Sequence, residues 1–193
     1  RFGREHLIQE GFVETHTPKI VATATEGGAD LFPMQYFDRP AFLNQSPQLF
    51  KQLCMSGGLE RVFEIGPAFR AEKSDTYRHL AEFISFDIEC SWANDDDVMG
   101  VLERMLHHIW KSVAEEEESQ SLIATINEFR AEQGEEPVEV IVPDLPFPRV
   151  EYDDAIRIIK EKGGSIEWGD DIDAENSAVS YTHLTLPTIG CVE

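Results

Sequence analysis

A short stretch of the chain combines a cation, carboxylates and aromatic rings at spacings that suit a ligand pocket. Arg70 closes an expected strand, where an arginine can form paired hydrogen bonds to a phosphate, and Glu72 follows on the same side. Alternation along the next expected strand gives one face that carries Phe83, Ser85, Asp87 and Glu89. A ring beside carboxylates is typical of a ligand pocket. A solvated sheet face with one stray aromatic residue is the alternative.

These residues need two strands and a helix to position them. Residues 61–70 and 80–92 predict an antiparallel hairpin around a polar loop. Its other face is predicted to be core and carries Ile84, Phe86, Ile88 and Cys90. Ser46-Pro47 predicts the start of a helix over residues 48–55, because a hydroxyl cap followed by proline is typical of a first helical turn. Gln48 and Lys51 then lie one turn apart on one face.

The remaining pattern predicts an α+β fold, an antiparallel sheet flanked by helices. We expect helices over residues 1–10 and 152–162, and short strands near residues 34–36 and 41–44. The longest helix begins at residue 95, with a buried face made of Val98, Leu102, Met105, Leu106, Ile109 and Val113.

Composition excludes several classes of protein. The 193 residues carry a formal net charge of −21, which argues against non-specific nucleic-acid binding through phosphate neutralisation. Three cysteines without a short pairing exclude a disulfide scaffold and fit a reducing cytoplasm. No apolar run is long enough for a membrane helix. We expect no metal site in this chain, because its histidines have no ligand partners at suitable spacing.

The last sixteen residues differ from the rest. Only one of the 37 acidic residues, Glu193, lies in residues 178–193, and no lysine or arginine does. We interpret this segment as a non-native tail, with a polar strand as the alternative, and treat residues 1–177 as the domain.

The hairpin resembles motif 2 of the class II aminoacyl-tRNA synthetases, on Phe69-Arg70-Ala71-Glu72 and Phe83. Thr17-Pro18-Lys19-Ile20 resembles the end of motif 1. Within the family, residues 26–32 and 44–52 are similar to the archaeal and eukaryotic aspartyl-tRNA synthetases. The resemblance extends to about Asn176 and implies a partial class II catalytic domain that contains motifs 1 and 2 but not motif 3.

The resemblance implies a role for individual residues. For aspartate these are the mobile-loop carboxylate Glu26, together with Gln48, Lys51, Asp87 and Arg70. For ATP they are Arg70, Ala71, Glu72, Arg78, His79, Leu80 and Phe83, with Arg70 as the catalytic residue on the α-phosphate. Pro18 corresponds to the proline of the dimer interface, and residues 73–77 to the loop that approaches the end of the tRNA.

The implied reaction joins L-aspartate to ATP as aspartyl-adenylate and then transfers the aspartyl group to tRNA(Asp), with tRNA(Asn) left open. The implied cofactor is Mg²⁺, the partner a second copy of the chain, and the compartment the cytoplasm. We expect the chain alone to be inactive, because it lacks the anticodon-reading domain, motif 3 and the acidic metal ligands of the family. An asparaginyl-tRNA synthetase, or a non-catalytic module that binds aspartate or its adenylate, remains an alternative. Lys51 opposes the first, since a carboxamide has no use for a cation.

Overall fold

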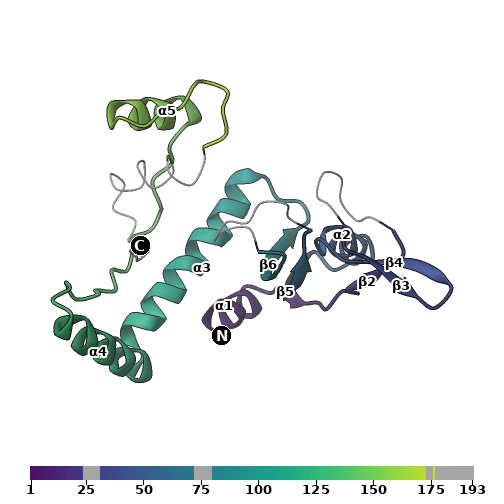
Figure 1. The fold of residues 1–193 in the computed structure, drawn as a ribbon, viewed down its shortest axis with the longest axis horizontal. Coiled ribbons are helices and arrows are strands. Elements are labelled where there is room, and N and C mark those ends of the chain that lie inside the picture. Colours follow the sequence, from purple (N-terminus) through teal and green to yellow (C-terminus); the bar gives the residue numbers. More distant parts are fainter. Residues whose placement is uncertain (24–30, 72–79, 173–175, 177–193) are drawn as a thin grey trace. The chain divides into compact units, whose positions relative to one another are not determined.

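The computed structural model describes residues 1–23, 31–71, 80–172 and 176. The chain divides into two compact units, the first made of Gly3–Val98 with Arg1 and the second of Met99–Glu193 with Phe2 (Figure 1). The first unit contains α1 (Phe2–Gln9), β1 (Val13–Glu14), β2 (Ile20–Val21), β3 (Pro33–Tyr36), β4 (Arg39–Leu43), α2 (Gln48–Ser56), β5 (Arg61–Phe69) and β6 (Glu82–Cys90). The second contains most of α3 (Asp95–Glu115), then α4 (Glu117–Glu132) and α5 (Tyr152–Glu161). The predicted α+β class is confirmed.

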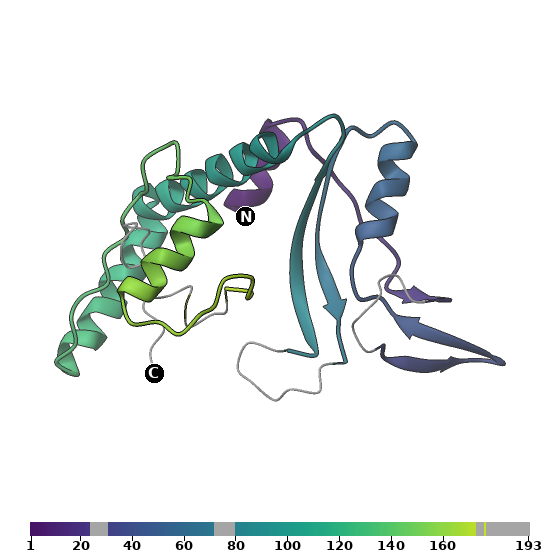
Figure 2. The same cartoon turned by 90° about the horizontal axis from the view of Figure 1, so that it is seen from above.

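The central sheet has the strand order β1-β5-β6. Strands β5 and β6 pair in antiparallel register from Arg61 opposite Cys90 to Phe69 opposite Glu82, which confirms the predicted hairpin (Figure 2). Strand β1 joins the outer side of β5 in parallel, with Val13 opposite Val62. The sheet is therefore mixed rather than purely antiparallel.

A second sheet, with the order β2-β4-β3, is antiparallel and is joined to the first through Asn44. The Asn44 backbone N–H donates to the Lys19 carbonyl at 2.9 Å, and its side-chain amide donates to the Pro18 carbonyl at 3.1 Å. Its own carbonyl accepts from the N–H of Phe69 at 3.1 Å. One buried residue thus ties the segment around Pro18 to the end of β5.

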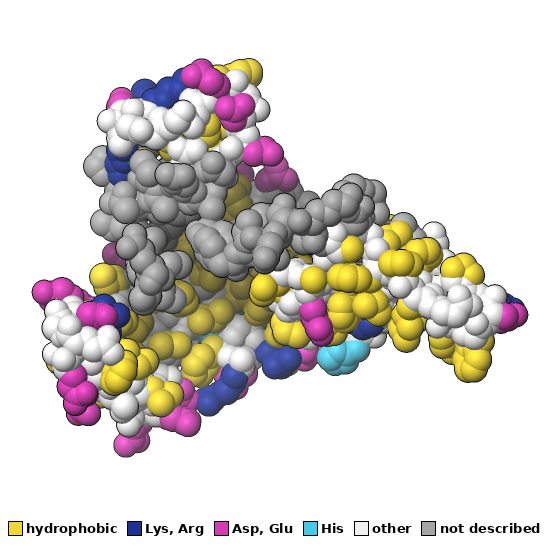
Figure 3. All heavy atoms as spheres, in the orientation of Figure 1, with side chains coloured by type: hydrophobic (Ala, Val, Ile, Leu, Met, Phe, Trp, Pro, Cys, Tyr) yellow, Lys and Arg dark blue, Asp and Glu magenta, His cyan; other side chains and the backbone are white. Residues whose placement is uncertain are grey.

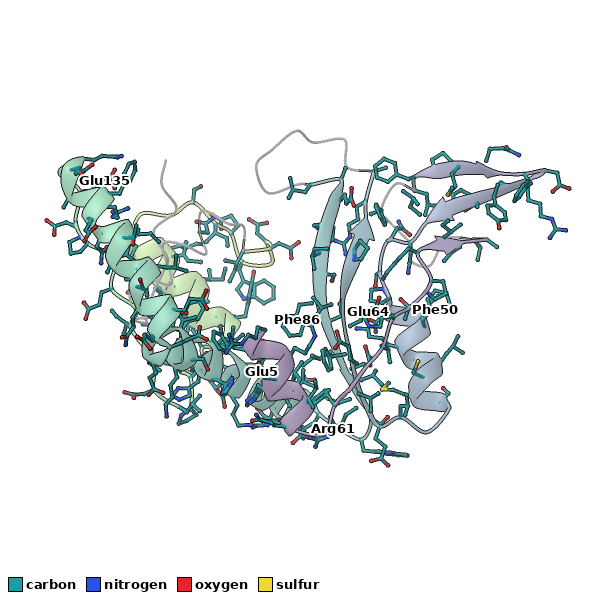
Figure 4. All side chains as sticks on the ribbon, turned by 90° about the horizontal axis from the view of Figure 1, so that it is seen from below. Glu5, Phe50, Arg61, Glu64, Phe86 and Glu135 are labelled. Carbon is teal, nitrogen blue, oxygen red and sulfur yellow. The ribbon has the colours of Figure 1, made fainter. Side chains whose placement is uncertain are left out.

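The face of β6 predicted to be core is only partly covered. Ile84 is 67% exposed and Phe86 is 41% exposed, although the Phe86 ring lies 6.3 Å from that of the fully buried Phe63. Alternation predicted the two faces of the strand correctly, but burial also requires a covering layer. Among the described elements of this unit, α2 is the helix that packs on β5 and β6, and it covers the opposite face (Figure 4).

The surface of the first unit is apolar around the β3–β4 hairpin. Figure 3 shows hydrophobic side chains gathered over these strands. The exposed residues include Ile20, Tyr36 and Phe37, and the last two rings meet edge to face at 5.0 Å. Ile20 lies two residues from Pro18, which is also exposed.

The second unit has its own small core, made by α5 and the segment after it. Ile156, Ile159 and Ile166 are buried together, with Ile172 packed against them. In α3 the buried residues are Val101 and Met105, whereas Val98 and Leu102 are exposed, so the predicted buried stripe is only partly right. The pattern also gave no sign of α4, which buries none of its residues. In the part of the chain that the structure describes, no helix has the length and apolar character needed to cross a membrane.

Candidate active site

Helix α2 begins where the sequence predicts and carries two of the expected site residues. The Gln48 N–H donates to Ser46 Oγ at 3.1 Å, and the Lys51 N–H donates to the Pro47 carbonyl at 3.0 Å. The Ser46 N–H in turn donates to Asn44 Oδ1 at 3.2 Å. Because the first turn is fixed by the side chains just before it, Gln48 and Lys51 point in a defined direction from a short helix.

Lys51 is buried between two carboxylates of β6. It is 1% exposed, and its Nζ lies 3.6 Å from Asp87 Oδ1 and 3.6 Å from Glu89 Oε2. An isolated ammonium at such depth would cost on the order of several kcal/mol, and the two carboxylates offset that cost. The structure therefore brings Lys51 and Asp87 together, as expected for two residues of one pocket.

Glu89, to which the sequence assigned no role, lies against both expected residues of α2. Its Oε2 faces Lys51, and its Oε1 accepts a hydrogen bond from Gln48 Nε2 at 3.3 Å. One carboxylate thus holds both expected aspartate-site residues of α2. The signal was present in the strand alternation, which puts Glu89 two residues beyond Asp87 on the same face.

Asp87 is oriented by its neighbour on β6. The Ser85 hydroxyl donates to Asp87 Oδ2, which leaves Oδ1 directed at Lys51. Asp87 has a side chain that is partly open to solvent, unlike that of Lys51. The group can therefore meet a cation from inside the protein and one that arrives from solution.

Arg70 and Phe83 lie together at the far end of the hairpin. The Arg70 N–H donates to the Ala81 carbonyl at 2.9 Å, so the residue continues the β5–β6 pairing by one step. Its guanidinium carbon lies 5.4 Å from the centre of the Phe83 ring, which is within the range of a cation–π contact. Arg70 Nε is buried and has no hydrogen-bond partner in the described structure. A buried donor without an acceptor is suited to an incoming anion.

The other expected residues are placed only in part. Ala71 and Leu80 flank the loop of the hairpin, and Leu80 is exposed. Pro18 is exposed, and its carbonyl accepts the Asn44 bond described above. Four expected site residues lie outside the described residues, namely Glu26, Glu72, Arg78 and His79.

The described residues do not form a metal centre. Within residues 1–23, 31–71, 80–172 and 176, no group of three or more histidine, cysteine or acidic side chains is arranged to hold a metal ion. The carboxylates of the pocket are instead occupied by Lys51 and Gln48. Asp87 and Glu89 thus contact groups of the protein itself.

Comparison with known proteins agrees with this geometry. A model of the tRNA synthetases of class II (D, K and N) matches residues 1–185. The chain therefore belongs to the class II tRNA synthetase family.

Among the curated relatives, the Aspartate--tRNA(Asp/Asn) ligase of Archaeoglobus fulgidus is 52% identical over 169 residues. The Aspartate--tRNA(Asp) ligase of Thermoplasma volcanium is 48% identical over 172 residues. These alignments cover 88% and 89% of this chain but 36% and 37% of the relatives. The chain thus spans little more than a third of the length of these relatives.

Solved structures share the fold. The asparaginyl-tRNA synthetase of Pyrococcus horikoshii, complexed with asparaginyl-adenylate, matches 94% of this chain and 39% of its own. The TM-score is 0.77 at 37% identity. The aspartyl-tRNA synthetase of Entamoeba histolytica matches 93% of this chain and 31% of its own, with a TM-score of 0.65 at 30% identity.

Proposed function

We propose that the full-length protein containing this chain is an aspartate–tRNA ligase. It activates L-aspartate with ATP to give aspartyl-adenylate and pyrophosphate, and then transfers the aspartyl group to tRNA(Asp). Relatives with about 50% sequence identity carry this name; some are named for tRNA(Asp) alone and others for tRNA(Asp/Asn). The proposal therefore leaves open whether the enzyme also charges tRNA(Asn).

The observation that carries the proposal is the buried Lys51. A carboxylate from solution needs a fixed cation, and Lys51 is held in place by Asp87 and Glu89. The α-ammonium of the amino acid needs a fixed anion, and Asp87 is the partly open carboxylate beside Lys51. Gln48, fixed by Glu89, adds a neutral hydrogen-bonding group from the same helix. Glu26 completes the set as the carboxylate of the preceding loop.

Arg70 is the proposed ligand of the α-phosphate. Its buried Nε has no acceptor among the described residues, and its position is fixed by the Ala81 backbone contact and the Phe83 ring. Attack by the aspartate α-carboxylate places extra negative charge on the α-phosphate oxygens. A fixed guanidinium there stabilises the transition state more than the ground state. Phe83 is the proposed stacking partner of adenine, and Ala71, Glu72, Arg78, His79 and Leu80 are the other proposed ATP contacts.

The proposal includes the partners that the family implies. A second copy of the chain meets the exposed segment around Pro18, so that the enzyme is a homodimer. Mg²⁺ accompanies ATP, and none of the residues of this chain is proposed as its ligand. The reaction takes place in the cytoplasm, where tRNA is used.

An asparagine-specific enzyme is the second candidate, because a solved asparaginyl-tRNA synthetase has the same fold with a TM-score of 0.77. The pocket separates the two functions by charge. A cation in contact with the substrate side chain favours a carboxylate, and a carboxamide gains much less from it. Lys51 therefore supports aspartate as the substrate.

The test is pyrophosphate exchange into ATP by the full-length protein, measured with L-aspartate and with L-asparagine. We expect exchange with aspartate and little or none with asparagine. Arg70→Gln should reduce the aspartate-dependent rate by about 10²–10³-fold, since a guanidinium on developing charge is removed. Exchange that depends on asparagine alone would replace the proposal with the second candidate. Tight binding of an aspartyl-adenylate analogue without any exchange would point to a non-catalytic module.

A further inference from the structure

A second buried ion pair lies on the same sheet face as the proposed aspartate pocket. Glu64 of β5 is 2% exposed, and its Oε1 lies 2.5 Å from Lys19 Nζ. The Thr17 N–H donates to both Glu64 oxygens, at 3.3 and 3.2 Å. None of the roles implied by the family resemblance includes either Lys19 or Glu64.

The register of the sheet places the Lys19–Glu64 pair next to the proposed aspartate pocket. Glu64 pairs directly with Asp87 across β5 and β6, so the two side chains leave the sheet on the same face. Such opposed residues have Cβ atoms about 4.5–5.5 Å apart. Figure 4 shows Glu64 on the side of the sheet that faces α2, whereas Phe86 lies on the other side.

The Lys19 side chain lies over this face beside Gly66, which follows Glu64 on the same face of β5 and has no side chain. A Cβ placed on Gly66 would lie 3.2 Å from Glu64 Oε1 and 3.5 Å from Lys19 Nζ. A side chain at position 66 would thus crowd the contact between Lys19 and Glu64.

The pocket and the adjacent pair together carry five formal charges. Two cations, Lys19 and Lys51, stand against three carboxylates, Glu64, Asp87 and Glu89, which leaves one negative charge in excess. Without Lys19 the excess would be two. The added charge would lie on Glu64, beside the carboxylate that holds Lys51.

We propose that Lys19 is a specificity-determining residue, which neutralises Glu64 so that the pocket accepts the negatively charged side chain of aspartate. The inference rests on the proposed function and extends it to a residue that does not touch the substrate. An unbalanced Glu64 repels the aspartate side chain and competes with it for Lys51. Asparagine has the same shape without the charge, so its binding is much less affected. Lys19 therefore sets the preference for aspartate over asparagine.

The test measures this preference in the full-length protein. The quantity is the inhibition constant of L-asparagine divided by the KM of L-aspartate in pyrophosphate exchange. Lys19→Met should lower the ratio by about tenfold or more, because one charge at an effective dielectric constant of about 20 changes an affinity tenfold at roughly 12 Å and by more at shorter range. The loss should appear in the KM for aspartate and not in the KM for ATP.

A second substitution distinguishes charge from structure. Glu64→Gln in the Lys19→Met background removes the unbalanced carboxylate, so the ratio should return to within about threefold of the unmodified protein. A purely structural role predicts instead that the double variant is no better than the single one. A ratio that Lys19→Met leaves unchanged, or that the second substitution does not restore, overturns the proposal.

Two further measurements keep the test decisive. Lys111→Met removes an exposed lysine whose nearest carboxylate, Glu115, is 4.0 Å away, and it should leave the ratio unchanged. If Lys19→Met does not fold, Glu64→Gln alone serves, because it removes a negative charge and should raise the ratio. A ratio that stays equal or falls in Glu64→Gln overturns the proposal. Absence of aspartate-dependent exchange in the unmodified protein would instead refute the proposed function itself.

Discussion

Ion pairs of the same chemical type occupy opposite environments in the two units. In the first unit, Lys51 and Glu64 are almost fully buried and each is met by more than one partner. In the second, Lys160 and Glu167 lie 3.2 Å apart with side chains that are 45% and 86% exposed. The distances alone would rank the exposed pair above the 3.6 Å contacts of Lys51. Burial reverses that ranking, since water screens the exposed charges and cannot reach the buried ones.

The two units therefore use charged side chains for different purposes. The first unit uses buried charge on its sheet face and has apolar residues around it, which is costly for stability but suited to binding a charged ligand. The second unit stabilises itself with a small apolar core around Ile159 and leaves its charges on the surface. Removing one charge should therefore have very different effects in the two units.

The largest effect is expected for Lys51→Met. It should raise the KM for L-aspartate by about 100-fold and lower the free energy of unfolding of the first unit by about 3–5 kcal/mol, because two carboxylates lose their buried cation. Steady-state exchange kinetics and urea unfolding of the full-length protein measure the two quantities. Unchanged affinity for aspartate would remove Lys51 from the substrate site.

The matched control is Lys160→Met, the same substitution at an exposed pair. It should change the free energy of unfolding by no more than about 0.5 kcal/mol and leave the KM for aspartate unchanged. A loss comparable to that of Lys51→Met would contradict the claim that burial separates the two pairs.

An intermediate effect is expected for Gly164→Ala, which tests the apolar core of the second unit. The new Cβ would overlap Ile159 Cγ2 and lie 2.7 Å from Asn176 Oδ1, so the α5 core must shift. Overpacking of this kind costs about 1–3 kcal/mol of stability, measured by thermal unfolding. Gly100→Ala in α3 is the control with the opposite sign. Its Cβ meets the flexible end of Arg104, and alanine in a helix should stabilise by about 0.5–1 kcal/mol.

The smallest effect is expected for Glu103→Gln, and it should depend on pH. The Phe147 N–H donates to Glu103 Oε2 at 3.0 Å, and this bond, followed by Arg149, lowers the pKa of Glu103 below its usual 4.5. A lowered pKa stabilises the fold above the unfolded value and loses that contribution as the pH falls through the folded value. The variant should be about 1 kcal/mol less stable at pH 7.

The difference between Glu103→Gln and the unmodified protein should shrink below pH 4.5 and vanish once the native carboxyl is protonated. Thermal unfolding across this range measures it. A difference that stays constant from pH 7 to the acid limit would show that the side-chain amide, and not the loss of charge, is responsible.

The parts of the structure that the sequence predicted are those set by short-range patterns. The β5–β6 hairpin follows from alternation on both sides of one loop, and the start of α2 follows from Ser46-Pro47. Helix α4 was missed because its polar and apolar residues do not form the stripe that predicts a buried face. The exposed Ile84 shows the reverse error, since a correct strand pattern does not reveal what covers it.

The family resemblance named Lys51 and Asp87, and the structure brings them together, while their roles at the substrate stay predictions. Strand alternation placed Glu89 on the same face as Asp87 but gave no sign of its contact with Lys51. The Lys19–Glu64 pair was missed because its two residues are 45 positions apart, and only the fold brings them together. A single carboxylate inside the apolar run Val62-Phe63-Glu64-Ile65 was the available signal, since an acid is rarely buried without a partner.

The separation between Lys19 and Glu64 also matters during synthesis. The contacts of α5 close within Ile156 to Ile172, so this small core can form as soon as it leaves the ribosome. Lys19 must instead await a carboxylate 45 residues later, which at about 5–20 residues per second is a delay of roughly 2–9 seconds. In the first part of that time, until Asn44 has been made 26 residues after Pro18, the segment lacks both its ion pair and the Asn44 bonds that anchor it. A nascent chain in this interval carries unpaired strand edges, which are open to pairing with other chains.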